Sequence, residues 1–320
     1  MSYLRWALPG LLALLAACSE PEPPPPEPPQ DITPVPTLDA AAQRQADAAY
    51  YNQLRARWLE LEHAERSSPE PETEQPVVAV PPAERKPPVP AAPVPSGATP
   101  ALAIVIDDVG HNLHHGRRLL ALPAPVTLAI LPHTQAAQRL AEEAAAQGRS
   151  VILHQPMENG AGLSIGPGGL YNGMQPDELR QVLQNNLDSF APILGLNNHM
   201  GSRLTAERQA MDEVMQVLRE RNLFFIDSRT THHTQAAFAA EAAGVPHLSR
   251  DVFLDNDRDP AAIARAFSRA LDVARREGRA LLIGHPYPQT LEFLEWRLAG
   301  DLLAEEGVEV VDVVELLGRE

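Results

Sequence analysis

The chain has 320 residues, a formal net charge of −16 and a single cysteine, Cys18. This acidity argues against non-specific binding to nucleic acid, and the sequence has no basic run with interleaved aromatic residues. One cysteine excludes an internal disulfide framework and an all-thiolate metal site, so a metal would have to be held by oxygen and nitrogen ligands.

Residues 1–18 have the pattern of a secretory signal, with Arg5 near the start and an apolar run up to Ala17. The last four residues, Leu15-Ala16-Ala17-Cys18, resemble a bacterial lipobox. This resemblance implies cleavage before Cys18, lipidation of that cysteine and export as a periplasm-facing lipoprotein, and Ser19 favours an anchor in the outer membrane. A plain signal peptide or a short anchor helix with an incidental cysteine is the alternative.

Residues 19–100 are rich in proline and predict a disordered tether, because proline-rich runs stay extended and build neither a sheet nor a core. At about 3.1 Å per residue, such runs could hold a domain on the order of 100 Å from a membrane anchor. Residues 38–66 are free of proline, and Tyr50, Leu54 and Trp58 have helical spacing. We therefore predict an amphipathic helix there, which either binds a protein partner, associates with itself or the domain, or stays solvated.

From residue 101 to 320, apolar strand patterns alternate with helical patterns. The predicted strands are Leu102–Ile106, Val126–Leu131, Val151–Leu153, Ile193–Leu196, Leu223–Ile226, Val252–Leu254, Ala280–Ile283 and Val308–Val311. The clearest predicted helices are Thr134–Gln147, Pro176–Phe190, Ala206–Glu220 and Pro260–Glu277. This alternation predicts an α/β fold with parallel strands, and seven to eight strands fit a distorted or incomplete (β/α) barrel. A doubly wound open sheet is the alternative, although no glycine-rich phosphate loop follows the first strand.

Polar side chains follow most of these strands, which in a barrel places them at one rim, where active sites are assembled. They are Asp107 and Asp108, then His133, His154, the run Asn197-Asn198-His199-Met200-Gly201-Ser202, Asp227, Asp255 and His285. Several such residues converging on one rim predict a catalytic site.

The residue types point to a metal. Adjacent carboxylates repel each other and favour binding of a proton or a cation. One carboxylate and two imidazoles without a thiolate suit a catalytic zinc or another first-row divalent ion. Such an ion lowers the pKa of water to about 7, and a nearby carboxylate and imidazole can then act as base and acid. Asp107 and His285 are placed for these two roles.

Short motifs hold these residues: Ile106-Asp107-Asp108-x-Gly110, His154-x-Pro156-Met157, Asn197-Asn198-His199-Met200-Gly201-Ser202, Asp227-Ser228 and Ile283-Gly284-His285-Pro286-Tyr287-Pro288. Together they resemble the divergent polysaccharide deacetylase family over essentially all of residues 101–320. The resemblance implies a distorted barrel related to the carbohydrate-esterase deacetylases, which use a divalent metal to remove N- or O-acetyl groups from sugars. It also implies that Asp107 is the base, Asp108 a metal ligand and His285 the general acid.

The metal-binding histidines depart from the pattern of the better-known deacetylases, which take both from one His-x-x-x-His motif. Here the fourth residue after His154 is Glu158, and the fourth after His199 is Arg203. We therefore expect one histidine from each of two strands, His154 and His199, to complete the site with Asp108.

Further residues are expected to support the site or bind substrate. Asn198 and Ser202 flank His199, Arg203 or Arg250 could pair with Asp107, and Asp227 or Asp255 could orient His285. Structural roles are the competing interpretation: the aspartate pair could cap a helix, His199 could belong to a loop turn, His154 could be a core histidine and His285 could sit in a rigid turn.

The leading hypothesis is a metal-dependent hydrolase, with zinc as the expected ion, that removes acyl and most plausibly acetyl groups from an envelope or extracellular polysaccharide. The alternative is a non-catalytic envelope lipoprotein whose barrel binds a glycan or a protein partner. A metal-dependent hydrolase acting on a different amide or ester is a third reading.

Overall fold

The computed structural model describes residues 99–300 and 306–319. The predicted signal with Cys18, the predicted tether and the predicted helix over residues 38–66 lie outside these described residues. None of the helices described is both long enough and apolar enough to cross a membrane.

Strands and helices alternate along the described chain, as the sequence predicts. The strands are β1 (Ala101–Val109), β2 (Val126–Ile130), β3 (Val151–Met157), β4 (Gly195–Met200), β5 (Phe224–Asp227), β6 (His247–Ser249), β7 (Val252–Phe253), β8 (Arg279–Gly284) and β9 (Glu309–Val311). The helices are α2 (Leu113–Leu120), α3 (Ala137–Ala146), α4 (Pro176–Leu187), α5 (Arg208–Glu220), α6 (Ala236–Ala243), α7 (Pro260–Glu277), α8 (Pro288–Arg297) and α10 (Val313–Leu317), with a 3-10 turn at Leu204–Ala206.

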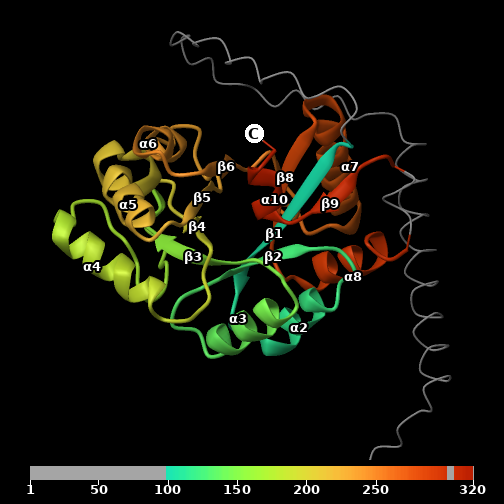
Figure 1. The fold of residues 1–320 in the computed structure, drawn as a ribbon, viewed down its shortest axis with the longest axis horizontal. Coiled ribbons are helices and arrows are strands. Elements are labelled where there is room, and N and C mark those ends of the chain that lie inside the picture. Colours follow the sequence, from blue (N-terminus) through green and yellow to red (C-terminus); the bar gives the residue numbers. More distant parts are fainter. Residues whose placement is uncertain (1–98, 301–305, 320) are drawn as a thin grey trace, which may run out of the picture. The chain divides into compact units, whose positions relative to one another are not determined.

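The strands form one curled parallel sheet, in the order β6-β5-β4-β3-β2-β1-β8-β7 (Figure 1). Strand β1 lies inside the sheet, where it pairs with β2 on one edge and with β8 on the other, so that strands from the two ends of the domain are neighbours. Strand β9 pairs with the first residues of β1. Strands β6 and β7 follow each other in sequence but do not pair with each other, so the barrel stays open there. The strand order runs with the sequence from β1 to β6, which confirms the predicted incomplete barrel over a doubly wound sheet, whose strand order reverses direction.

The strands near the site are longer than the sequence predicts. Strand β1 continues through Asp107 and Asp108 to Val109, and β3 continues through His154 to Met157. Polar residues end the apolar pattern from which strands were predicted, whereas the backbone pairing continues past them. The short strand β6, with only three residues, carries no such pattern and was not predicted.

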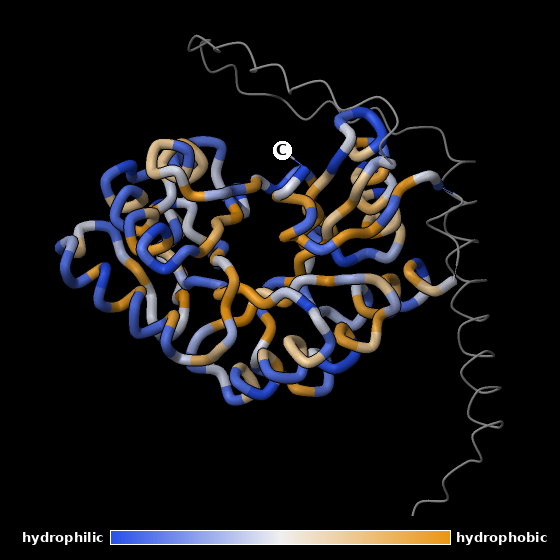
Figure 2. Tube along the Cα trace, in the orientation of Figure 1, coloured by the Kyte–Doolittle hydropathy of each residue, from blue (hydrophilic) through white to orange (hydrophobic). Residues whose placement is uncertain are grey.

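Two hydrophobic clusters lie on opposite faces of the sheet because side chains alternate along each strand. Even-numbered residues of β1, such as Leu102 and Ile104, belong to the large cluster that packs under the helices. Odd-numbered residues of β1 join a smaller cluster with residues of β3, β5 and β8, which fills the barrel interior. In Figure 2 the strands are accordingly mostly hydrophobic, and the helices show hydrophobic and hydrophilic stretches in turn.

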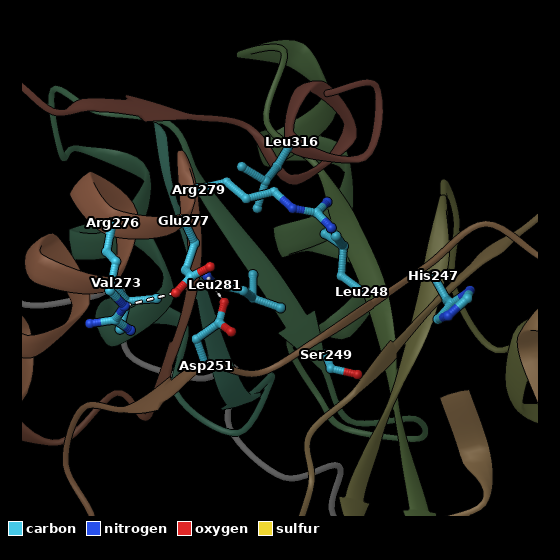
Figure 3. Close-up of a pocket in the computed structure, with 10 residues that line it drawn as sticks. All are labelled: His247, Leu248, Ser249, Asp251, Val273, Arg276, Glu277, Arg279, Leu281 and Leu316. Carbon is cyan, nitrogen blue, oxygen red and sulfur yellow. Dashed lines mark hydrogen bonds and ion pairs between the residues drawn. The ribbon is translucent and has the colours of Figure 1, made fainter. Parts of the chain in front are cut away.

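The amino end of the barrel is closed by α10. Val313 and Leu316 of this helix join the interior cluster. Asp312 caps the helix by accepting a hydrogen bond from Val314 N, and its second contact is with Ser150 Oγ, which donates to Asp312 Oδ1 at 2.6 Å. A cavity of about 550 Å³ lies beside this helix, between β6 and the start of β8, where the barrel is open (Figure 3).

Candidate active site

The barrel interior changes from apolar to polar at the carboxyl ends of the strands. Asp107, His154 and His285 each follow an apolar interior residue by two positions, so the alternation of side chains points them into the barrel. Asn197 pairs with His154 in register across β3 and β4 and therefore faces the same way, as does His199 two residues later. Four strands thus bring these side chains to one place.

Asp108 would face outward if β1 were regular, but the strand is irregular at this residue. The register against β2 shifts between Ile106 and Val109, and Asp108 has a φ of 54°. A non-glycine residue in this left-handed region costs on the order of 1–3 kcal/mol, and such strain is concentrated at functional sites. Gly110 follows at a φ of 121°. Only glycine fits there, because a Cβ would meet Thr134 Oγ1 at 2.1 Å. The bulge turns two adjacent carboxylates toward one site.

Asp108, His154 and His199 form a cluster of three ligand-type side chains. Asp108 Oδ1 lies 2.9 Å from His199 Nδ1 and 3.2 Å from His154 Nε2. The two imidazole nitrogens are 3.1 Å apart. The structure therefore brings together the two histidines predicted from separate strands and the predicted aspartate.

The donor set of this cluster fits a divalent cation. Asp108 Oδ1 is buried and, among the described residues, has no hydrogen-bond partner, although both imidazole nitrogens approach it. A buried carboxylate oxygen without a hydrogen bond, with two imidazole nitrogens beside it, is arranged as ligands are arranged around an ion. Ligands about 2.0–2.2 Å from a tetrahedral ion lie about 3.4 Å from one another, close to the separations found here. One carboxylate and two imidazoles suit zinc or a similar first-row ion.

The charges of this cluster act strongly on one another. Burial raises the pKa of the Asp108 carboxyl, but the adjacent imidazoles and positive charges of His154 and His199 outweigh burial and hold it far below its ordinary value. Burial lowers the pKa of His154, but the charge of Asp107 and the contacts with Asp108 raise it to about 9. The site therefore favours positive charge at the point where the three side chains meet.

Asp107 lies deeper, beside the cluster, and is held by Asn197. Asn197 Nδ2 donates to Asp107 Oδ1 at 2.7 Å, and Asn197 Oδ1 lies 2.8 Å from His154 Nδ1. Burial raises the pKa of Asp107, against the opposing effects of His154, His285 and the bond from Asn197. A buried carboxylate with a raised pKa is a better proton acceptor than an ordinary aspartate.

His285 enters the site from the end of β8 and is oriented by Asp255. Asp255 Oδ1 lies 3.0 Å from His285 Nδ1, and Asp255 Oδ2 accepts hydrogen bonds from His285 N and Thr290 Oγ1. The other ring nitrogen, Nε2, lies 3.9 Å from Asp108 Oδ2. Burial lowers the pKa of His285, but the Asp255 hydrogen bond and the charge of Asp107 outweigh it, so the pKa is raised. His285 is therefore held with one nitrogen toward the cluster and prepared to donate a proton.

Two aromatic rings flank His285. The Phe253 and Tyr287 rings each lie 5.3 Å from the imidazole, and the Tyr287 ring is stacked on it. The guanidinium carbons of Arg250 and Arg258 lie over these rings, 5.1 Å from the Phe253 centroid and 4.8 Å from the Tyr287 centroid. These contacts restrict the orientation of the imidazole further.

The other predicted supporting residues are all near this end of the barrel, with different contacts. Asn198 Oδ1 accepts from Ser228 N at 2.9 Å, and Ser202 Oγ accepts from Gly160 N at 3.0 Å. Asp227 accepts from Arg229 N and Thr234 Oγ1. These bonds tie together the loops that follow β3, β4 and β5.

Neither Arg203 nor Arg250 pairs with Asp107, contrary to the expectation from the sequence. Arg203 pairs with Glu158 at 3.2 Å, and Arg250 donates to the carbonyls of Ser228 and Arg229. Asp107 instead accepts its hydrogen bond from the neutral Asn197. His133 is exposed, and its Nε2 lies 2.9 Å from Asn186 Oδ1, apart from the cluster.

Asn197 is part of the candidate site, and it lies in a sequence motif from which only its neighbours are predicted as site residues. Its signal was the alternation of β4, since Asn197 and His199 lie two positions apart and must share a face. The apolar pattern ends this strand at Leu196, whereas β4 continues to Met200, so the pattern alone does not place Asn197 on the strand.

Comparisons with known proteins agree with the fold. The sequence model described as "Divergent polysaccharide deacetylase" matches residues 104–317. The chain is 39% identical to the uncharacterized protein YibQ of Escherichia coli over 194 residues, which are 61% of this chain and 61% of YibQ. It therefore spans less than two thirds of that relative.

A second relative, an uncharacterized protein of Haemophilus influenzae, is 38% identical over 200 residues, which are 62% of this chain and 71% of the relative. The crystal structure of an uncharacterized protein from Agrobacterium tumefaciens aligns with a TM-score of 0.65 and 25% identity, over 71% of this chain and 92% of that one.

Proposed function

Because the chain belongs to the divergent polysaccharide deacetylase family, we propose that it is a metal-dependent hydrolase that removes acyl groups from an envelope or extracellular polysaccharide. Acetyl is the first acyl group to test and zinc the first metal. The observation that carries this proposal is the Asp108, His154 and His199 cluster, with Asp107 and His285 beside it. A purely structural cluster would not need the strained backbone at Asp108.

The metal would be held by Asp108, His154 and His199, and when bound it supplies Lewis-acid chemistry that acidifies water and polarises an acyl carbonyl. Asp107 accepts the proton of the attacking water, since its carboxyl is buried, has a raised pKa and is fixed by Asn197. Asn197 contacts both Asp107 and His154, so one side chain sets the position of the base relative to the metal-binding imidazole.

His285 is the proton donor in this proposal. Its Nδ1 is occupied by Asp255, so only Nε2 is available to protonate the departing sugar nitrogen or oxygen. Thr290 fixes the second oxygen of Asp255 and thereby the orientation of the imidazole. Asp107 as base and His285 as acid are thus two separate groups beside the same cluster, as hydrolysis of an amide or ester requires.

The test is to measure metal content and acetate release in parallel, with the full chain and its Asp108→Asn variant purified without chelator. Asparagine tolerates the left-handed backbone of residue 108, so the variant should fold. We expect about one divalent ion per chain in the parent and loss of both metal and acetate release in the variant. A parent that binds no ion after reconstitution would favour the alternative, a non-catalytic protein that binds glycan or a protein partner.

We also propose that the domain is exported and anchored through lipidated Cys18, with the outer membrane as the first location to examine. This rests on the lipobox-like Leu15-Ala16-Ala17-Cys18 and on a polysaccharide substrate that would be found outside the cytoplasm. Incorporation of labelled fatty acid into the parent and its loss in Cys18→Ser is the expected result. Labelling of the variant, or an unlabelled parent, would contradict the anchor.

A further inference from the structure

A second hollow, of about 270 Å³, lies apart from the metal cluster. It is formed by the end of the loop between β3 and α4 and by the first turns of α4 and α5. In a barrel of this type the helices begin where the strands end, so this hollow is at the same end of the barrel as the catalytic residues. Its lining includes Tyr171, Asn172, Gln175, Leu179, Glu207 and Gln209.

The lining combines an aromatic ring with uncommitted polar groups. Tyr171 is 45% exposed, one of few large hydrophobic side chains at the surface of the described chain, and Leu179 is buried beneath. In residues 99–300 and 306–319, the side-chain amides of Gln175 and Gln209 make no hydrogen bond within the protein. The first turns of α4 and α5 have no side-chain cap, so the backbone N–H groups of α5 and those that follow Pro176 in α4 are further donors.

This chemistry matches a neutral sugar. A pyranose presents a C–H face that packs on an aromatic ring, and its hydroxyl groups both donate and accept hydrogen bonds, as amide side chains do. Glu207 and Glu213 in the wall disfavour an anionic ligand, and the polar lining disfavours a lipid chain. We therefore expect the ligand of this hollow to be uncharged and rich in hydroxyl groups.

Glu158 connects this hollow to the metal cluster. Its Oε2 accepts from Asn172 N at 2.6 Å, and its Oε1 pairs with Arg203 at 3.2 Å. The backbone oxygen of Glu158 also accepts from Arg203 N at 3.1 Å. Glu158 directly follows β3, which carries His154, and Arg203 follows β4, which carries His199. The loops around the hollow are thus fixed to the two strands that hold the histidines.

We infer that this hollow is a glycan subsite, in which Tyr171 stacks on a neutral sugar unit of the polysaccharide while a different unit of the same polymer presents its acyl group at the metal cluster. The inference rests on the proposed function for the identity of the polymer. It goes beyond that function by predicting that the protein binds chains of several sugars better than single sugars.

The test is binding of neutral oligosaccharides to the full, metal-loaded chain by titration calorimetry. The probes are hexamers of N-acetylglucosamine and of xylose, each with its monomer for comparison. We expect one hexamer to bind more tightly than its monomer, and Tyr171→Ala to weaken hexamer binding about tenfold, as loss of an aromatic stacking contact does. Leu194→Ala is the matched control, because Leu194 is 43% exposed but precedes β4 at the other end of the barrel, and its binding should equal that of the parent.

Gln209→Ala, on the exposed first turn of α5, provides a second variant in case Tyr171→Ala does not fold, and it should also weaken hexamer binding. Equal hexamer affinity in the parent and in the folded variants, or no binding of either hexamer, would overturn the subsite. Hexamer binding that depends on Tyr171, without release of acetate from any acetylated glycan, would preserve the subsite and contradict the hydrolase.

Discussion

The two ends of the barrel are built by the same strands, but their interior side chains differ, being polar at the carboxyl end and apolar at the amino end. At the carboxyl end, Asp107 and His154 are buried polar residues, and Asp108, Met200 and Arg229 have positive φ angles. At the amino end the same faces of the strands carry apolar residues, and Val313 and Leu316 of α10 pack against them.

This difference indicates which end of the barrel lowers the folding stability and which end raises it. Buried polar groups and left-handed residues each cost free energy, and the apolar interior below them offsets that cost. If this division holds, changes at the carboxyl end should alter turnover with little loss of stability, and changes at the amino end should do the reverse.

Asp107→Asn should have the largest effect. The variant keeps the shape of the side chain but cannot accept a proton, so we expect kcat for deacetylation to fall about a thousandfold, or about 4 kcal/mol. Metal content should remain at the parent level because Asp107 is not one of the three clustered ligands. Loss of the metal together with activity would mean that Asp107 binds the ion itself.

Ile152→Ala should destabilise the domain without changing its chemistry. Ile152 is fully buried in the interior cluster, two residues before His154. Removing its side-chain atoms leaves a cavity, and we expect the free energy of unfolding to drop by about 3 kcal/mol in urea titrations. The kcat of the folded variant should stay within about twofold of the parent. A large fall in kcat would show that the interior packing positions the histidines.

The fold could be predicted from the sequence because the outer and inner faces of the strands are both apolar. Continuous apolar runs such as Leu102–Ile106, separated by helical patterns, are typical of parallel strands, and their number indicated an incomplete barrel. Strand ends could not be predicted, because the polar residues that end an apolar run still pair in register, as Asn198 does with Gln155.

The cluster of Asp108, His154 and His199 could be predicted because residues after parallel strands meet at one end of the sheet. Its supporting contacts could not. Whether an arginine reaches Asp107, and whether Asp227 or Asp255 reaches His285, depends on loop conformations that no spacing in the sequence reveals. The structure selects Asp255 for His285 and places Arg203 on Glu158.

Asn197→Ala tests whether the hydrogen bonds of the carboxyl end position the catalytic groups. Asn197 is fully buried between Asp107 and His154, and residues that orient metal ligands typically contribute a factor of about 10–100. We expect kcat/KM to fall within that range, with weaker metal binding in a competition assay against a chelator. Asn197→Ser, which restores a smaller hydrogen-bonding group, should recover part of the loss. No effect on either quantity would assign Asn197 to packing alone.

Asp251→Asn should have the smallest effect and sharpens the comparison at the amino end. Asp251 Oδ2 accepts a hydrogen bond from Leu281 N at 2.8 Å beside the cavity between β6 and β8. Asp251 is an exposed residue, but partial desolvation of its carboxyl beside the cavity raises its pKa, so the folded protein loses a small, solvent-screened part of its stability as the pH rises through that pKa. Asparagine keeps an acceptor for Leu281 and does not ionise. The variant should therefore be more stable than the parent at pH 7, by less than about 1 kcal/mol, and the difference should shrink in acid, where the parent carboxyl is protonated. Urea titrations at pH 7 and in acid measure this difference in the free energy of unfolding. The kcat for deacetylation should be unchanged, because Asp251 lies at the end of the barrel opposite the metal cluster. A change in kcat would mean that the two ends of the barrel are coupled.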